Sequence, residues 1–198
     1  MWEGLSKRLE GQLVVLEPLR EAHLEPLWEA AQDDRTWTWY HGDAPTREWF
    51  EAFLGDALEE AARGEEAPFA TLDRRSGSVV GSTRFLSLRP EHRGLEIGST
   101  WLDPVAWKTG VNVEAKLLML EHAFERLGCM RVELKTDARN ERSRAAMAAL
   151  PAQFEGIHRK HMLRPYGVRD SAWYSVVDDE WPAVKANLER RRDAHLVA

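Results

Sequence analysis

The sequence predicts one α+β domain built on a mixed β-sheet, and three observations predict it. Segments with strand alternation and segments with helical spacing of apolar residues follow one another in the order β-α-α-β-β-β-α-β-α-β-β. No repeat, low-complexity stretch or linker divides the chain, so we expect a single domain over 1–198, with its core at about 11–180 and a helical tail at 182–198. Hydrophobic residues make up 43% and charged residues 30% of the 198 residues, which is typical of a folded protein with a sizeable core.

The first half of the chain predicts one strand, two helices and a β-hairpin. Pro18 ends an apolar run, and Thr46 is a good N-cap for a helix with one apolar face. The aromatic segment between the two helices has many turn residues and no periodicity, which favours a loop. The expected elements are a strand at 13–17, a helix at 20–31, a loop at 36–45, a helix at 46–62, and strands at 68–72 and 78–86 joined by a turn at 73–77.

The second half predicts alternating strands and helices. Gly128 marks the end of a helix with a regular apolar stripe, and Asn140 caps the next helix. We expect the charged helix that begins at Pro182 to fray. The expected elements are a strand at 95–102, a helix at 111–127, a strand at 131–137, a helix at 140–150, and strands at 154–162 and 172–177.

The charge and the single cysteine restrict the function. The net charge is −6 and the isoelectric point about 5.7, which argues against nucleic acid as the main partner, because that partner needs clustered Lys and Arg. A negative protein would attract an amine-bearing substrate, although a modest negative charge is also ordinary for a cytoplasmic protein. Cys129 is the only cysteine, so no internal disulfide can form, and a buried structural thiol is favoured over a nucleophile.

The chain shows no sequence pattern for a membrane or a metal. The N-terminal residues lack the apolar region of a signal peptide, and no run approaches the roughly 18 apolar residues of a membrane helix. We therefore expect a soluble, cytoplasmic protein. His158 and His161 are three residues apart on an expected strand, so we expect them on opposite faces and not as a metal pair.

The segment 94–113 predicts an anion site. An extended strand is followed by a break at Asp103-Pro104, a short loop centred on Gly110, and the start of a helix. A glycine just before a helix lets backbone N–H groups approach an anion, so a phosphorylated cofactor would bind here. The alternative is that Gly110 is an ordinary turn glycine opening an amphipathic helix.

Three signatures in this order resemble a GCN5-related N-acetyltransferase (GNAT), specifically the branch with the Rim-type ribosomal-protein N-terminal acetyltransferases. The resemblance covers about residues 11–180. The signatures are Glu96-Ile-Gly98 with Trp101-Leu-Asp-Pro104, then Trp107-Lys-Thr-Gly-Val-Asn112, then Asn140-Glu-Arg-Ser143 with Phe154-Glu-Gly156 downstream.

The resemblance implies a GNAT fold. That fold has a central mixed, mostly antiparallel sheet of about seven strands, with a splayed central parallel pair and about four flanking helices. The loop signature departs from the family, because Trp107 stands where Gln or Arg is usual, Lys108 replaces a glycine and Asn112 replaces Gly or Ala, whereas Gly110 is retained. A non-glycine at Lys108 is tolerated where its φ is negative.

The resemblance implies acetyl-CoA as the acyl donor and no metal. Asn140 matches the family's coenzyme-contacting asparagine, and it can serve as a helix N-cap at the same time. The residues implied to contact the coenzyme are Trp101, Leu102, Lys108, Thr109, Gly110, Val111, Asn112, Val113 and Asn140.

Two residues are implied to act in catalysis. Glu96 is the candidate base, directly or through a water, and its alternative is a strand carboxylate with a structural partner. Ser143 resembles a serine that passes a proton to the coenzyme sulfur, and its alternative is a first-turn serine bonded to the backbone. The carboxylate base of some Rim-type enzymes has no match, and His161 or Met162 lies nearest to its position; His161 could replace it near neutral pH.

The acceptor side is expected between the first two helices. Its aromatic residues either bind a cation or an apolar first residue of the acceptor, or pack the two helices together. The expected activity is transfer of an acetyl group to a primary amine, foremost a protein or peptide N-terminus and secondly a polyamine or other small amine. A non-catalytic acyl-CoA-binding domain is the rival, and a homodimer is left open. The candidate acceptor-binding residues are Trp37, Trp39, Tyr40 and His41.

Overall fold

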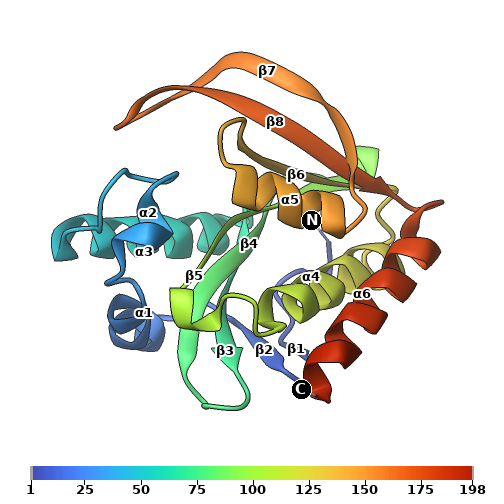
Figure 1. Cartoon of the computed structure of the whole chain (residues 1–198), viewed down its shortest axis with the longest axis horizontal. Helices are drawn as coiled ribbons and strands as arrows, with labels where there is room; N and C mark the ends of the chain where they lie inside the picture. Colours follow the sequence, from blue (N-terminus) through green and yellow to red (C-terminus); the bar gives the residue numbers. More distant parts are fainter. Residues whose placement is uncertain (1, 198) are drawn as a thin grey trace.

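An eight-stranded mixed sheet organises residues 2–197, the part of the chain that the computed structural model describes (Figure 1). Its order is β1-β2-β3-β4-β5-β6-β8-β7. β5 and β6 run parallel, and the other neighbouring pairs run antiparallel. The strands are β1 (Leu9–Glu10), β2 (Val14–Pro18), β3 (Ala67–Asp73), β4 (Val79–Arg89), β5 (Gly94–Leu102), β6 (Arg131–Asp137), β7 (Gln153–Arg164) and β8 (Gly167–Val177).

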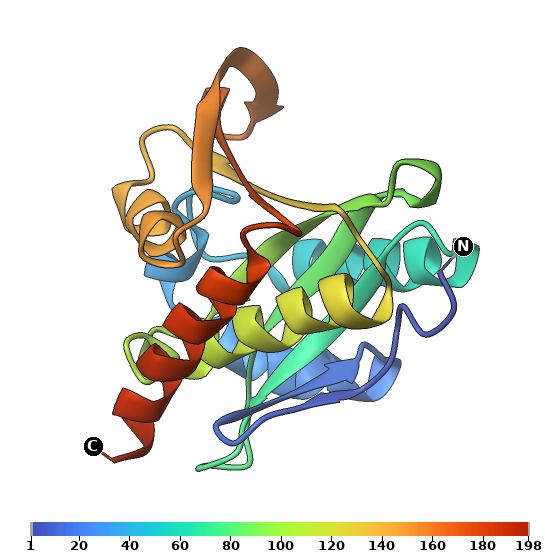
Figure 2. The same ribbon diagram turned by 90° about the vertical axis from the view of Figure 1, so that its right-hand side faces the viewer.

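Helices cover both faces of the sheet, as the two views show (Figures 1 and 2). α4 and α6 contribute to the larger apolar core on one face, whereas α1, α2 and α3 form a second apolar cluster on the other. The helices are α1 (Leu24–Ala30), α2 (Asp34–Trp37), α3 (Arg47–Arg63), α4 (Val111–Glu121), α5 (Glu141–Ala149) and α6 (Trp181–Leu196).

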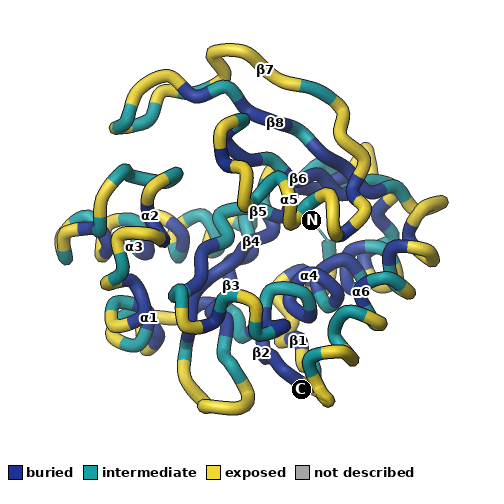
Figure 3. Tube along the Cα trace, viewed as in Figure 1, coloured by how far each residue is buried: buried dark blue, intermediate teal, exposed yellow. Residues whose placement is uncertain are grey.

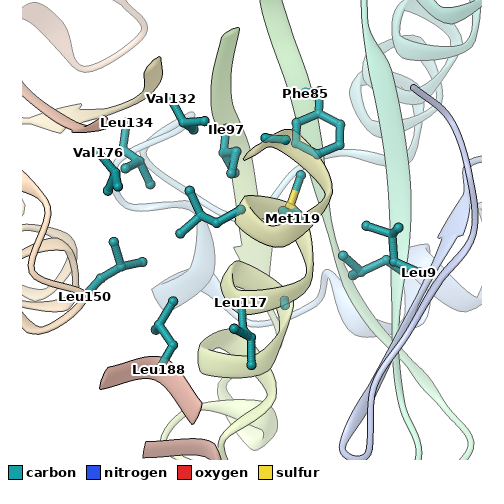
Figure 4. Close-up of a cluster of buried hydrophobic side chains, with 14 of the residues drawn as sticks. Leu9, Phe85, Ile97, Leu117, Met119, Val132, Leu134, Leu150, Val176 and Leu188 are labelled. Atoms are coloured by element: carbon teal, nitrogen blue, oxygen red, sulfur yellow. The ribbon is translucent and has the colours of Figure 1, made fainter. Parts of the chain in front are cut away.

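The larger core forms where strand alternation meets helical spacing (Figure 4). Leu95 and Ile97 of β5 face α4, whose Met119 and Leu120 are fully buried. Each such side chain contributes about 1.5–3 kcal/mol by leaving water. The dark trace of the sheet and α4 in Figure 3 contrasts with the largely exposed β7, so the β7–β8 hairpin extends beyond the core.

A buried carboxylate fastens the start of α4 to the start of β2. The Glu114 side chain is fully buried and accepts three backbone hydrogen bonds, from Gln12 at 2.8 Å, Leu13 at 2.6 Å and Val14 at 2.8 Å. The carboxylate thus supplies the acceptor for three consecutive main-chain amides. This contact fixes where α4 begins, and the loop before α4 is part of the candidate site.

The predicted fold class is confirmed, and several local predictions are confirmed with it. Thr46 accepts from the Trp49 amide at 3.2 Å, and Asn140 accepts from the Ser143 amide at 3.1 Å, so both predicted N-caps form. The turn at 73–77 joins β3 to β4 in a hairpin.

The helical tail and the strand count differ from the prediction. The tail does not fray: α6 is a 16-residue helix whose Trp181, Val184 and Leu188 are buried in the larger core. β1 adds an eighth strand, and two residues are too few to produce an alternating pattern. The expected loop at 36–45 begins inside the short helix α2, which Asp33 caps by accepting from the Arg35 amide.

Candidate active site

The two parallel strands at the centre of the sheet separate part-way along their length. β5 pairs with β6 over Gly94–Glu96 and Arg131–Glu133. Both strands then continue, to Leu102 and Asp137, but within the described chain they no longer bond to each other. The predicted splayed pair is confirmed, and the backbone groups that face the opening are available to a ligand.

A β-bulge in β5 lies directly beyond the point of separation. The pairing of β4 with β5 shifts by one residue between Gly98 and Trp101, and Ser99 has a φ of +46°. The extra residue turns Thr100 towards α4, where it meets Lys116, and turns Trp101 into the cluster formed with α1, α2 and α3. Such bulges redirect backbone and side chains next to active sites.

The loop that leads into α4 presents backbone amides without partners. Among residues 2–197, no protein group accepts from the amides of 108–110 or 112–113. The Val111 amide donates to the Thr109 hydroxyl at 3.5 Å, and the first amide of the helix that bonds to the backbone is that of Glu114, which donates to the Gly110 carbonyl at 3.0 Å. These N–H groups lie at the positive end of an 11-residue helix. The arrangement suits an anion such as a diphosphate.

Two residues of this loop adopt the left-handed conformation. Lys108 has a φ of +63°, so it keeps the conformation of the glycine that it replaces, which costs about 1–2 kcal/mol. Gly110 has a φ of +94°, and a Cβ there would lie 2.8 Å from side-chain atoms of His195 and Leu13. The end of α6 therefore packs directly against the loop, and only glycine fits at 110.

The other predicted coenzyme residues divide into backbone and side-chain contributors. Trp101, Leu102 and Val111 are buried in the apolar clusters. Leu102 and Val111 therefore offer a ligand only main-chain groups, whereas the buried indole N–H of Trp101 has no acceptor among the described residues. The Thr109 hydroxyl donates to the Ala106 carbonyl at 2.8 Å. Asn112 has a buried Oδ1 with no hydrogen-bond partner among the described residues.

Trp107 connects the loop to the helix on the other side of the opening. Its indole N–H donates to the Leu102 carbonyl at 3.0 Å. The guanidinium of Arg142, on α5, lies 3.6 Å from the centre of the Trp107 ring, and that of Arg35 lies 5.6 Å from it. Cation–π contacts of this kind orient both partners. Trp107, which stands where the resemblance predicts Gln or Arg, therefore holds α5 against the loop.

Glu96 lies where the strands part, on the face opposite α4. It is 2% exposed, and its carboxylate accepts from Lys135 Nζ at 2.7 Å and from the Ser87 hydroxyl at 3.3 Å. Its other oxygen lies close to Gly98, where an added Cβ would come within 2.9 Å. The sequence left open whether Glu96 has a structural partner. Lys135 is such a partner, and it holds the carboxylate at the opening.

Ser143 and Asn140 lie at the start of α5. The Asn140 side chain is 8% exposed and caps the helix through the Ser143 amide. Within residues 2–197 the Ser143 hydroxyl bonds neither to the backbone nor to a side chain, and the residue is partly exposed. Its hydroxyl is therefore available to a ligand in the opening.

The four aromatic candidates lie in different surroundings. Trp37 is fully buried and packs against Phe50 and Trp101, so it joins the helices to β5. The other three, Trp39, Tyr40 and His41, are partly exposed. Only these three can contact a substrate directly, and Trp37 supports them from behind.

The predicted separation of His158 and His161 is wrong. Their ring centres lie 5.6 Å apart, and both rings pack on Trp173. A register shift between His158 and Met162, with Lys160 at a φ of +50°, places them on one face. No group of three metal-binding side chains occurs among residues 2–197, and no helix there is long and apolar enough to cross a membrane.

Lys116 is a site residue that the sequence did not indicate. It is 8% exposed, and its Nζ donates to the Thr100 hydroxyl at 2.9 Å, in contact with the β5 bulge. Burial lowers the pKa of Lys116 to about 7, with an opposing contribution from Glu96. Its position in the α4 sequence looks like that of any helical lysine, so only the bulge that turns Thr100 inward reveals it.

Stability should depend on pH through Lys116. The folded pKa of about 7 lies below the ordinary 10.5, so the unfolded chain binds more protons between these values. The Lys116 contribution to the free energy of unfolding should therefore rise with pH in this window, by up to about 1.4 kcal/mol per pH unit, with no slope below it. In urea denaturation at pH 7, 8 and 9, Lys116→Met should remove this slope and Lys7→Met should keep it. Equal slopes for wild type and Lys116→Met would contradict the prediction.

Comparison with known proteins agrees with this geometry. The model of the acetyltransferase (GNAT) domain matches residues 14–152. A crystal structure from T. thermophilus, described as an acetyltransferase, is 41% identical, covers 96% of this chain and 99% of that chain, and has a TM-score of 0.86. Mycobacterium smegmatis RimJ in complex with CoA-disulfide is 20% identical over 96% of this chain and 97% of that chain, with a TM-score of 0.81, and shows the same fold.

A curated relative, the uncharacterized N-acetyltransferase YoaA of Bacillus subtilis (strain 168), is 28% identical over 104 residues. That match spans 52% of this chain and 58% of the relative's length. The family match over most of the chain, together with the separated parallel strands and the open loop, shows that this chain belongs to the GNAT acetyltransferase family.

Proposed function

We propose that this acetyltransferase moves the acetyl group of acetyl-CoA to the α-amine of a protein or peptide N-terminus by direct attack. One observation carries the proposal: the parallel strands part at Glu96, next to a loop whose amides have no protein partner among residues 2–197. The opening could receive a thioester, and the loop could receive the diphosphate of its carrier.

Several features support acetyl-CoA as the donor. The free amides of 108–110 and 112–113 match a diphosphate, and each favourable charge near a helix N-terminus contributes about 0.3–1 kcal/mol. The RimJ structure, which shares the fold, was solved with CoA-disulfide. Lys108 adds a cation on an exposed loop position.

The chain also has groups for the proton transfers. The amine nitrogen would attack the thioester carbonyl and lose a proton to Glu96 or to a water that Glu96 holds. The main chain of the β5 bulge would donate to the oxyanion. The C–S bond then breaks, and Ser143 would give a proton to the departing thiolate. No covalent enzyme intermediate is needed.

The ordinary acidity of amines favours an N-terminus over a lysine. An α-amine has a pKa of about 7.7–8.0, so roughly a tenth is neutral at pH 7, whereas a lysine with a pKa of about 10.4 is neutral in roughly one molecule in 2,500. Without a group that lowers the pKa of the acceptor, the α-amine reacts more readily. A polyamine or other small amine is the second candidate, and a cytoplasmic location stays a prediction.

Ser143→Ala should lower kcat by about 10²-fold, because the thiolate would leave without a proton donor. The substitution keeps the N-cap, since Asn140 bonds to the Ser143 amide and not to its hydroxyl. Ser143→Thr, which retains a hydroxyl, is the control and should keep most of the activity. An unchanged kcat in the alanine variant would remove Ser143 from the mechanism.

Two measurements test the function as a whole. Calorimetry with acetyl-CoA should show binding, and thiol release should occur with peptides that have a free N-terminus. Binding without turnover on any amine would favour the non-catalytic alternative. Absence of acetyl-CoA binding would contradict the donor assignment, and a preference for spermidine over every peptide would contradict the acceptor assignment.

A further inference from the structure

The β7–β8 hairpin carries two arginines, Arg164 and Arg169, on one face. Met162 lies opposite Arg169 in the register of the hairpin, and Arg164 follows Met162 by two residues, so all three side chains share a face. Leu163 lies on the other face and is 84% exposed. The arginines therefore occupy the protected face of the hairpin, which arches over the rest of the molecule in Figure 1.

Neither arginine has an anionic partner among residues 2–197. Arg169 is 7% exposed, and its Nε donates to the neutral hydroxyl of Ser171 at 3.0 Å. Arg164 donates from one Nη to the Met162 sulfur at 3.6 Å, and its buried Nε has no acceptor. A buried guanidinium normally has a carboxylate or phosphate partner, because desolvation is costly without one.

The hairpin end that carries both arginines lies beside the segment after α2, because the Tyr166 hydroxyl bonds to the Trp39 carbonyl at 3.2 Å. Burial raises the pKa of Tyr40 to about 12, and the positive charge of Arg84, a hydrogen bond from Ser99 and the charges of Arg164 and Arg169 act against that rise. Ser99 is the bulge residue, and Tyr40 follows α2. The two guanidinium groups are thus close enough to Tyr40, on the expected acceptor side, for their charges to act on it.

Asp137, whose negative charge acts on Arg169, already has other partners. Asp137 accepts from Arg139 at 2.9 Å and from the Tyr166 hydroxyl at 3.2 Å. The single O–H of Tyr166 is shared between Asp137 and the Trp39 carbonyl, which also lies 3.2 Å away, and this ties the end of the hairpin to the segment after α2. Asp137 therefore closes the hairpin end and does not pair with the two arginines.

The segment around the two arginines also has a net positive charge. Residues 131–170 contain nine Lys and Arg but five Asp and Glu, in a protein of net charge −6. A positive region on a negative protein attracts and orients an anion.

We propose that the acceptor carries a carboxylate close to its amine, and that Arg164 and Arg169 bind this carboxylate while the amine reaches the β5 bulge. The inference rests on the proposed function for the amine. The carboxylate is either an acidic side chain beside an N-terminus or the carboxylate of a free amino acid. Two arginines without counter-ions would repel a polyamine, so the second candidate acceptor of the proposed function is disfavoured.

Two matched pairs of probes test the inference and separate the two sources. One pair is an N-terminal Ala-Glu peptide amide and the Ala-Gln peptide amide, and the other is free alanine and alaninamide. In thiol release, the carboxylate member of at least one pair should have a kcat/KM higher by about tenfold or more. Calorimetry with the same probes and no coenzyme should show the same order of affinity.

The variants identify the residues. Arg164→Gln and Arg169→Gln should each bring the ratio of kcat/KM between the carboxylate probe and its amide partner close to one. The change should appear in KM and not in kcat. Arg159→Gln is the matched control, because Arg159 is exposed on the same hairpin, and it should keep the preference. If Arg169→Gln does not fold, Arg164→Gln and Arg169→Lys provide the same comparison.

The outcomes separate this inference from the proposed function. Equal kcat/KM and equal affinity within both pairs, or efficient turnover of spermidine, would overturn the inference while acetyl transfer stands. Absence of turnover on every amine would overturn the proposed function. Calorimetry would then still show whether the protein binds the carboxylate probes more tightly than their amide partners, which tests the carboxylate site independently.

Discussion

Replacing Glu114 with alanine is expected to lower the free energy of unfolding by about 3–5 kcal/mol. The substitution removes the acceptor of the Gln12, Leu13 and Val14 amides. The bonds of Leu13 and Val14 are buried, and each buried unsatisfied donor costs about 1–3 kcal/mol. It also releases the start of α4 from β2. Urea denaturation should show a lower midpoint with a nearly unchanged slope.

Glu121→Ala on the same helix is the control for this prediction. The Glu121 side chain is 41% exposed, and its oxygen lies 3.5 Å from Lys185, so its loss should cost less than about 1 kcal/mol. Glu114→Gln keeps only one acceptor oxygen and should be intermediate. A loss below about 1 kcal/mol for Glu114→Ala would show that these amides find other partners.

Replacing Glu96 with glutamine is expected to lower kcat/KM by about 10²–10⁴-fold, because the opening would lose its only proposed proton acceptor. Glutamine has nearly the same shape and its carbonyl can still accept from Lys135, so the fold should persist. Thiol release across pH 6–9 measures the effect. The rates of both enzymes should still rise with pH as more of the acceptor amine becomes neutral, so the variant should stay slower than the wild type at every pH.

Glu133→Gln is the matched control for the catalytic prediction. Glu133 lies opposite Glu96 in the parallel pair, on the same side of the sheet, and is bonded to Arg131 at 2.9 Å. Its substitution should change kcat/KM by only a few-fold. If Glu133→Gln lowers kcat/KM as much as Glu96→Gln does, the effect reflects the loss of a negative charge and not of a base. An unchanged kcat/KM in Glu96→Gln would leave His161 or a water as the base.

Much of the fold was predictable because it depends on local patterns. The cap at Asn140 and the glycine at Gly110 were identified from residue types that few other positions require. α6 was misjudged because its many charges obscured a buried stripe, which forms only when α4 is in place. The two-residue strand β1 has no pattern of its own, and its neighbour β2 defines it.

The site was less predictable because bulges and register determine it. One extra residue at Ser99 turns Thr100 towards Lys116, and a shift near Lys160 brings His158 beside His161. Strand alternation predicts the opposite for each of these side chains. The roles proposed for Glu96 and Ser143 stay predictions, although each lies where a ligand in the opening could meet it.

The boundary of the family match has a consequence for the molecule. The match ends at residue 152, before β7, β8 and α6. β8 is the antiparallel neighbour of β6, and α6 supports the loop through His195. Removal of the residues after 152 would therefore leave β6 as an unpaired edge strand of the sheet. Residues 153–197 therefore complete both the sheet beside β6 and the packing of the loop before α4, although the family match does not include them.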